Sequence, residues 1–396
     1  TTAASTTAAS TAAASSSDGS AAAAPTAAAT ATEAPTTASS ITDGAPAERT
    51  ARRTRPPART SAGPSALAVA GLVTAVFGIV LLAQVFLLPP ATFGGVDNPG
   101  AWFPPESRAE LLVAKMDGHT FAQIADDPLM QHTVAAYHGD ETNAAYRASR
   151  PMMGWIYFVA SLGGQRVLLA PSILVVTALT AGGLVLATAL LGRAMGFRVR
   201  GLWTLPVMPA LVAALAYPGI AEPFACSLTL AACAAWVRRR DRWATALFAA
   251  AALTREQMLL VPLAIGLDHV VRTRSLRRVL PLAIPAAVYA GWVAVVHARI
   301  GAYPSEYSPM DGFLVGFRQG FPHWHPAEWA AAALLLVSGA VIARYGTGWM
   351  RAVLVVHLLF FPWMNYQVWW VWLGFGRVGT ILPLLALVAW SGEVDR

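Results

Sequence analysis

The sequence predicts an all-α, polytopic helical membrane protein with about ten transmembrane spans. Hydrophobic residues make up 56% of the 396 residues and charged residues only 12%, which is about half the charged share of a soluble domain. Ten apolar runs follow one another along the chain, and clusters of arginine stand at every second junction between them. Cytoplasmic loops of membrane proteins carry such an excess of basic residues.

The first segment of the chain, 1–65, is almost entirely Ala, Thr, Ser and Pro and ends in the basic run RTARRTRPPAR at 49–59. It has too few large apolar side chains to offset the entropy of ordering the chain, so we expect a disordered tail. A basic run directly before the first apolar stretch keeps that end in the cytoplasm. The membrane domain is predicted over 66–391.

Each apolar run is predicted to be a helix that crosses the membrane, and the first has the roughly 20 residues that a crossing needs. Between the first and second runs lies a long polar segment, 89–164, which we expect to be an outer loop with interfacial helices. The ten runs are 66–88, 168–191, 202–218, 223–237, 243–253, 257–271, 279–297, 327–343, 352–363 and 378–390.

The arginine clusters at 193–200, 238–242 and 272–278 fix the predicted orientation. With these clusters inside, both termini are cytoplasmic, and the inner side holds 19 basic and 8 acidic residues against 9 and 13 outside. The net charge of +7 therefore reflects topology, so we expect a lipid bilayer and no nucleic acid as partner. Lys115 is the only lysine. This skew toward arginine is typical of a GC-rich genome, so we expect an actinobacterial protein of the cytoplasmic membrane.

Two short hairpins predict a polar cavity. Residues 243–271 must cross twice, yet two helices of about 14 residues each reach only ~21 Å of the ~30 Å hydrocarbon core. The tip of this hairpin carries Arg255 and Glu256, and the tip of the preceding hairpin carries Glu222. Charges at membrane depth face a cavity or a partner. We therefore expect an outward-facing cavity floored by these three residues. The other interpretation is that Arg255 pairs with one of the carboxylates as a structural contact, and both can hold.

The outer segment contains MDGHTFAQIADDP, in which Asp117 and Gly118 break one helical pattern and can begin another. Asp is a favoured N-cap residue, so capping is one role open to Asp117. The apolar residues of 144–164 suit a helix at the membrane interface, with Trp155 and Tyr157 at the level of the lipid headgroups. The stretch NYQVWWVW at 365–372 is predicted to be an outer aromatic belt that could also line a saccharide or lipid groove.

Four pieces of the chain resemble the GT-C superfamily of membrane glycosyltransferases, and within it bacterial, mannosyltransferase-like enzymes that use polyprenyl-phosphate sugars. The first is DGHTFAQIADDP followed by YRASRPMMGWIYFVASLG; the others are AEPFACSLTLAACAAW, LTREQMLLVPLA and GFGRVGTILPLLALV. The resemblance spans about 66–391. The chain departs from it at His119 and Thr120, which replace a polar–aromatic pair, and at 125–127, which lacks a basic residue.

The resemblance implies sugar transfer from a polyprenyl-phosphate donor to a glycan or glycolipid acceptor. Asp117 would be the catalytic base for the acceptor hydroxyl. Arg377 would hold the donor phosphate, because the forked donors of arginine match the anion, with Arg150 and Arg255 as further candidates. The alternative for Arg377 is an interfacial arginine whose charged end reaches the membrane surface.

Asp126 and Asp127 could assist Asp117, or Asp127 could join it at a divalent metal. Hard oxygen ligands favour Mg²⁺ or Mn²⁺, although three acids within eleven residues also occur in an ordinary solvated loop.

Two other classes stay open at this stage. One is a transporter or lipid-glycan flippase in which Glu222, Arg255 and Glu256 form an ion or proton path, although the halves of the chain show no convincing repeat. The other is a non-catalytic integral membrane protein. The chain carries no Walker loop, no dinucleotide-binding glycine pattern after a strand and no zinc-protease helix motif.

Overall fold

The computed structural model describes residues 65–89, 106–114, 117–131, 141–307 and 310–395, and within these ranges the regular structure is entirely helical. The predicted tail up to residue 64, with its basic run, lies outside the described residues. The all-α prediction is therefore confirmed for the described part of the chain.

Four segments of the described chain are long and apolar enough to cross a membrane, which gives the protein the character of a membrane protein. They are α1 (Ala66–Leu87), α7 (Arg166–Ala194), the segment Leu280–Ile300 formed by the 3₁₀ helix η4 (Leu280–Ala283) and α12 (Ile284–Ile300), and α15 (Pro326–Tyr345). A fifth is obtained if α18 (Trp372–Val378) and α19 (Ile381–Val394), bent by 49° at their junction, count as one span.

The other apolar runs are helical but shorter. They form η2 (Leu202–Val207) with α8 (Pro209–Ala216), α9 (Glu222–Val237), α10 (Asp241–Thr254), η3 (Glu256–Leu259) with α11 (Leu260–Thr273), and α16 (Gly348–Phe360) with η6 (Phe361–Trp363). All ten apolar runs thus coincide with helices, whereas four or five have the length and composition of a full crossing.

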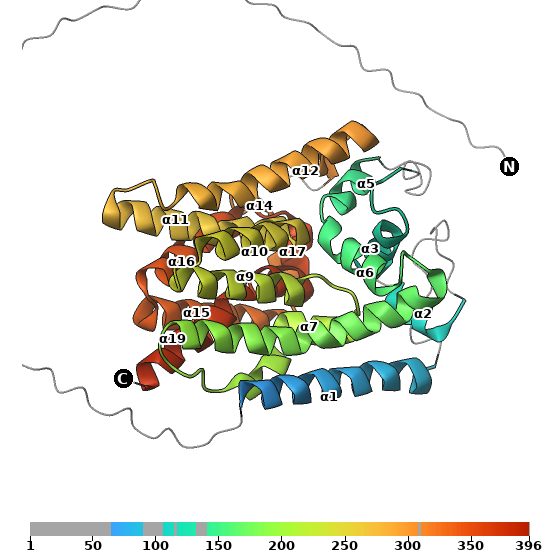
Figure 1. The fold of residues 1–396 in the computed structure, drawn as a ribbon, viewed down its shortest axis with the longest axis horizontal. Helices are drawn as coiled ribbons and strands as arrows, with labels where there is room; N and C mark the ends of the chain where they lie inside the picture. The colour runs from blue at the N-terminus through green and yellow to red at the C-terminus, as the bar shows by residue number, and fades with distance from the viewer. Residues whose placement is uncertain (1–64, 90–105, 115–116, 132–140, 308–309, 396) are drawn as a thin grey trace, which may run out of the picture. The chain divides into compact units, whose positions relative to one another are not determined.

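The polar segments between these helices carry short helices of their own. They are α2 (Arg108–Val113), α3 (Asp117–Asp126), α5 (Glu141–Ala148), α6 (Pro151–Ala160), α13 (Pro304–Tyr307), α14 (Val315–Gly320), η5 (Phe321–His323) and α17 (Tyr366–Trp370). Figure 1 shows α3, α5 and α6 gathered at one end of the long helices, beside one end of α12.

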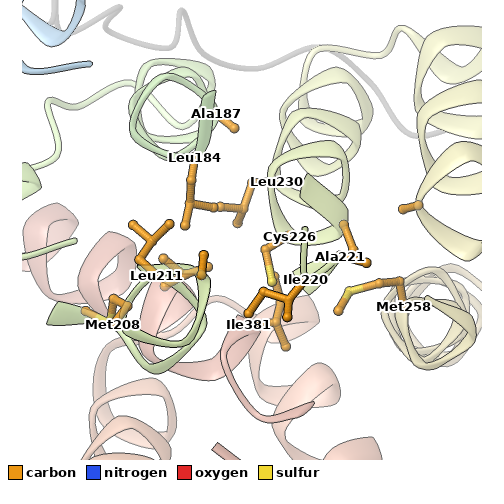
Figure 2. Packing of buried hydrophobic residues seen from close by; sticks show 14 of the residues in the cluster. Leu184, Ala187, Met208, Leu211, Ile220, Ala221, Cys226, Leu230, Met258 and Ile381 are labelled. Carbon is orange, nitrogen blue, oxygen red and sulfur yellow. The ribbon is translucent and has the colours of Figure 1, made fainter. Parts of the chain in front are cut away.

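The core lies where α7, α8, α9 and α19 meet. Figure 2 shows Leu184 of α7, Leu211 of α8, Cys226 of α9 and Ile381 of α19 converging, and all four side chains are buried. Small residues permit this close packing: a Cβ on Gly182 of α7 would lie 2.1 Å from a side-chain oxygen of α1 and 2.9 Å from a backbone oxygen. Membrane helices use small residues in this way, because close backbone approach gains van der Waals contact.

The outward faces of the long helices are apolar. On α1, for example, Phe77 is buried against the bundle, whereas Leu72, Ile79 and Phe86 are more than half exposed. Only about a quarter of the most apolar part of α1, and less of α12 and α15, is buried. Exposed apolar faces of this extent are expected of helices that lie against lipid tails.

The predicted interfacial helix over 144–164 is divided in the structure. Pro151 lacks a backbone N–H and restricts the residue before it, so α5 ends at Ala148 and a separate helix, α6, starts at Pro151. The predicted headgroup position of Tyr157 is wrong, because its side chain is fully buried. Trp155 instead donates a hydrogen bond to the backbone oxygen of Pro128. Helix α6 therefore packs into the protein rather than lying freely at an interface.

Candidate functional site

Two glycines bring Asp117 beside Glu222. A Cβ on Gly118 would lie 2.5 Å and 2.6 Å from the backbone oxygens of Val113 and Pro218, and a Cβ on Gly219 would lie 2.8 Å from the Cα of Gly118. Gly219 also has a positive φ of 92°, which favours glycine. Because neither residue has a side chain, the start of α3 touches the turn that leads into α9, and the break predicted at Asp117-Gly118 has a packing cause.

The two hairpin tips also meet. Glu222 is the first residue of α9, and Arg255 directly follows the last residue of α10. A carboxylate is stabilised at the N-terminus of a helix and a guanidinium at the C-terminus by the helix dipole. α10 and α11 each have 14 residues, as the spacing of the arginine clusters predicts. Arg255 and Glu222 are both buried, at 4% and 1% exposure.

Arg255 holds two carboxylates at once. Its Nη2 contacts the Oδ2 of Asp117 and lies 2.7 Å from the Oε1 of Glu222. Burial alone would raise the pKa of Asp117, but the guanidinium groups of Arg255 and Arg377 outweigh this effect and hold that pKa well below its usual range. Asp117 is thus the first residue of α3 and also the ion-pair partner of Arg255, so helix capping is not its sole contact.

Arg377 approaches the same carboxylates less closely. It lies in the last turn of α18, with its Nε 3.5 Å from Glu222 and its Nη1 3.8 Å from Asp117. Both nitrogens are buried and have no hydrogen-bond partner among the described residues. Gly374 permits close packing of α18 against α17, because a Cβ there would lie 2.2 Å from the backbone oxygen of Val368. Arg377 therefore has N–H groups that can donate hydrogen bonds to a ligand.

Arg150 belongs to a second ion pair in the same region. Its Nε and Nη2 donate to the two carboxylate oxygens of Glu256 at 2.7 and 2.6 Å, a forked geometry that strengthens the pair. The guanidinium also lies 4.1 Å from the ring centre of Tyr146. This pair links the segment between α1 and α7 to the tip of the α10–α11 hairpin.

A cavity of about 440 Å³ adjoins these ion pairs, which is a typical volume for a small-molecule site. The residues from the outer segment, the hairpins and α12 that line it are polar: Tyr146, Ser149, Arg150, Glu222, Arg255, Glu256, Gln257 and Tyr289. The lining from 304–378 is mainly apolar, with Pro304, Met310, Phe360, Met364, Val368, Gly374 and Val378 beside Ser305, Asn365, Gln367 and Arg377. The predicted cavity floor of Glu222, Arg255 and Glu256 is thus part of a cavity in the structure.

The cavity lies at the opposite end of the helices from the arginine clusters. α9 starts at Glu222 and is followed by the cluster at 238–242, which places about 24 Å of helix between them. Arg278 of the third cluster lies 3.3 Å from Asp241, so the second and third clusters adjoin one another. Arg200 of the first cluster pairs with Asp395 near the C-terminus at 2.7 Å.

The structure does not bring Asp126 and Asp127 to the site. Asp126 ends α3, about 14 Å along the helix from Asp117, and neither residue lines the cavity. Ligands of one Mg²⁺ or Mn²⁺ lie about 2 Å from the ion, so the predicted metal pairing of Asp117 with Asp127 is wrong. The described residues contain no group of three or more His, Cys, Asp or Glu side chains that could hold a metal ion.

Sequence reasoning missed several lining residues. Tyr289 lies within an apolar helix, and Phe360 and Met364 lie in and after another apolar run; apolar patterning alone does not distinguish a cavity wall from a lipid-facing surface. Gln257 could have been found, since it follows Arg255 and Glu256 at the predicted hairpin tip. The aromatic belt at 365–372 contributes Asn365, Gln367 and Val368 to the lining.

No protein-family model matches this chain, and no curated protein or solved structure matches it either. The resemblance to GT-C glycosyltransferases therefore stays a prediction.

Proposed function

We propose that this protein is a glycosyltransferase that moves a sugar from a polyprenyl-phosphate donor to a cell-envelope glycan or glycolipid. It would act at the outer face of a bacterial cytoplasmic membrane, with both termini inside and ten crossings. The observation that carries the proposal is the convergence of Asp117, Glu222, Arg255 and Arg377 beside one cavity. These residues supply a carboxylate for a hydroxyl group and guanidinium groups for a phosphate.

In the proposed reaction, the oxygen of the acceptor hydroxyl bonds to the anomeric carbon of the donor sugar. The bond from that carbon to the phosphate oxygen breaks, and its electron pair leaves with polyprenyl phosphate. Arg377 and Arg255 stabilise the negative charge that develops on the phosphate. The hydroxyl proton passes to the carboxylate of Asp117.

The ion pairs give donor binding a further effect on this base. In this arrangement, Asp117 is held by guanidinium groups and has a low pKa, which makes it a weak base. A donor phosphate competes for the same guanidinium groups, so its arrival increases the proton affinity of Asp117. The base is then strengthened when the donor is in place.

Asp117→Asn tests the mechanism. The substitution preserves size and removes the proton acceptor, so sugar transfer from lipid-linked donors should fall by about 10²- to 10⁴-fold. The matched control is Asp126→Asn at the exposed far end of the same helix, which should transfer at the wild-type rate. An Asp117→Asn protein that transfers sugar normally would contradict the mechanism. If Asp117 only capped the helix, Asp117→Ala would lose about 1 kcal/mol of stability and keep its transfer activity.

The proposed orientation is tested by cysteine labelling from outside intact cells. Gln319→Cys should react with a membrane-impermeant maleimide and Arg240→Cys should not, since both positions are exposed but lie in segments between predicted spans that are assigned to opposite sides. The native Cys226 and Cys233 are buried and give a low background. Labelling at 240, or none at 319 in well-expressed protein, would place Asp117 on the wrong side.

The rival functions predict different outcomes in the same experiments. A transporter or flippase would move a lipid-linked solute across the membrane without forming a new glycosidic bond. A non-catalytic protein would do neither. Reconstituted protein assayed for both transfer and transbilayer movement separates the three.

A further inference from the structure

Gln257 is the one residue of the Arg255–Glu256–Gln257 tip whose side chain is not in an ion pair. Arg255 pairs with Asp117 and Glu222, and Glu256 pairs with Arg150 through both oxygens. Gln257 lines the same cavity, and its Nε2 is buried without a hydrogen-bond partner among the described residues. A buried donor that lacks a partner costs free energy unless a ligand or water supplies one.

The charges around the cavity are already matched. Arg150, Arg255 and Arg377 stand against Asp117, Glu222 and Glu256. When a donor phosphate takes Arg377, no guanidinium remains for a second anion, and both carboxylates of the hairpin tips keep their arginine partners. A carboxylate on the sugar would therefore be buried without a counter-charge, which is strongly unfavourable.

We propose that Gln257 forms a hydrogen bond with a hydroxyl group of the donor sugar and thereby determines which sugar the cavity accepts, and that this sugar is uncharged. The inference rests on the proposed function. An amide can donate to and accept from a sugar hydroxyl, and Gln257 is the immediate chain neighbour of the ion-paired residues beside the phosphate. Tyr289 and Ser149 line the same cavity with hydroxyl groups, so the sugar meets neutral polar groups there.

The test measures binding of lipid probes to the full chain in lipid nanodiscs. The probes are undecaprenyl phosphate without sugar and its mannosyl, glucosyl, galactosyl and glucuronosyl forms. Wild type should bind the sugar-free lipid, prefer one of the three neutral sugars over the other two, and bind the glucuronosyl form most weakly. Loss of a buried hydrogen bond costs about 1–3 kcal/mol, a factor of roughly 5 to 150. Gln257→Leu should lower the preference by that factor and leave the affinity for the sugar-free lipid unchanged.

Two further variants keep the test decisive. Gln257→Asn retains the amide on a shorter side chain and should weaken the preference less than Gln257→Leu does. Gln319→Leu, at an exposed position on α14, is the matched control and should behave like wild type. A correctly folded Gln257→Leu protein that retains the full preference would overturn the inference, as would wild type without any preference or with the glucuronosyl form bound best. Wild type that binds neither the sugar-free lipid nor any glycosylated form would overturn the proposed function as well.

Discussion

Arg255 and Arg377 reach the same two carboxylates from different parts of the chain, yet their surroundings differ. Arg255 follows α10, is 5% exposed in its side chain, and contacts Asp117 and Glu222 within hydrogen-bond distance. Arg377 lies in α18, is 14% exposed, and stays 3.5–3.8 Å from the same carboxylates. Arg255 holds the two carboxylates through its Nη2 and leaves its Nε without a hydrogen-bond partner among the described residues, whereas Arg377 leaves both its Nε and its Nη1 without one.

An ion pair and a candidate ligand-binding group therefore share one cluster. From the sequence, a structural pairing of Arg255 and a place in a cavity were compatible, and in the structure Arg255 both pairs and lines the cavity. Arg377, which the sequence placed at the start of the last apolar run, has two nitrogens without hydrogen-bond partners among the described residues, whereas Arg255 has one, its Nε. Substituting each arginine should therefore affect stability and binding in different proportions.

The largest effect on stability is expected for Arg255→Met. Removal of one partner from a buried ion pair leaves uncompensated charge, at a cost of about 3–5 kcal/mol, and here two carboxylates lose their shared partner. The melting temperature in detergent should fall strongly, and the yield of folded protein with it. Arg299→Met, at an exposed position on α12, serves as the control and should change stability by less than about 0.5 kcal/mol. A normal melting temperature for Arg255→Met would show that Arg255 does not hold the cluster together.

The location of this cluster could be predicted from the sequence for physical reasons. The 29 residues 243–271 are too few for two full crossings. This length predicted that Arg255 and Glu256 lie at the tip of a short hairpin, beside a cavity. The pairings could not be predicted, because they depend on contacts between distant segments: Arg150 with Glu256, and Gly118 with Gly219. The error at Asp126 and Asp127 has a similar origin, since closeness in sequence does not place both ends of a helix at one site.

An intermediate loss of stability is expected for Gly118→Ala, which moves Asp117 away from Arg255 without changing any charge. The new Cβ would lie 2.5–2.6 Å from two backbone oxygens, and overpacking of this kind costs about 1–3 kcal/mol. Gly78→Ala on α1 is the control, because a Cβ there meets nothing within 4 Å and alanine favours a helix. Thermal unfolding of both variants gives the measurement. Equal melting temperatures would show that the Gly118–Gly219 contact does not position α3.

The smallest effect on stability is expected for Arg377→Ala, and it is the variant that separates the two arginines. Glu222 and Asp117 keep Arg255 as a partner, and the substitution also removes two buried nitrogens that lack hydrogen bonds. The free energy of unfolding should therefore change by less than about 1 kcal/mol. Affinity for undecaprenyl phosphate in nanodiscs should nevertheless fall by about 10- to 100-fold, since charge-assisted hydrogen bonds contribute about 1.5–3 kcal/mol. Arg377→Lys should recover only part of this loss, because a point charge replaces a forked donor.

Arg318→Ala, which replaces an exposed arginine on α14, is the control and should bind the lipid as wild type does. Unchanged lipid affinity in Arg377→Ala would assign Arg377 to membrane anchoring and leave Arg255 as the remaining guanidinium at the two carboxylates for the phosphate.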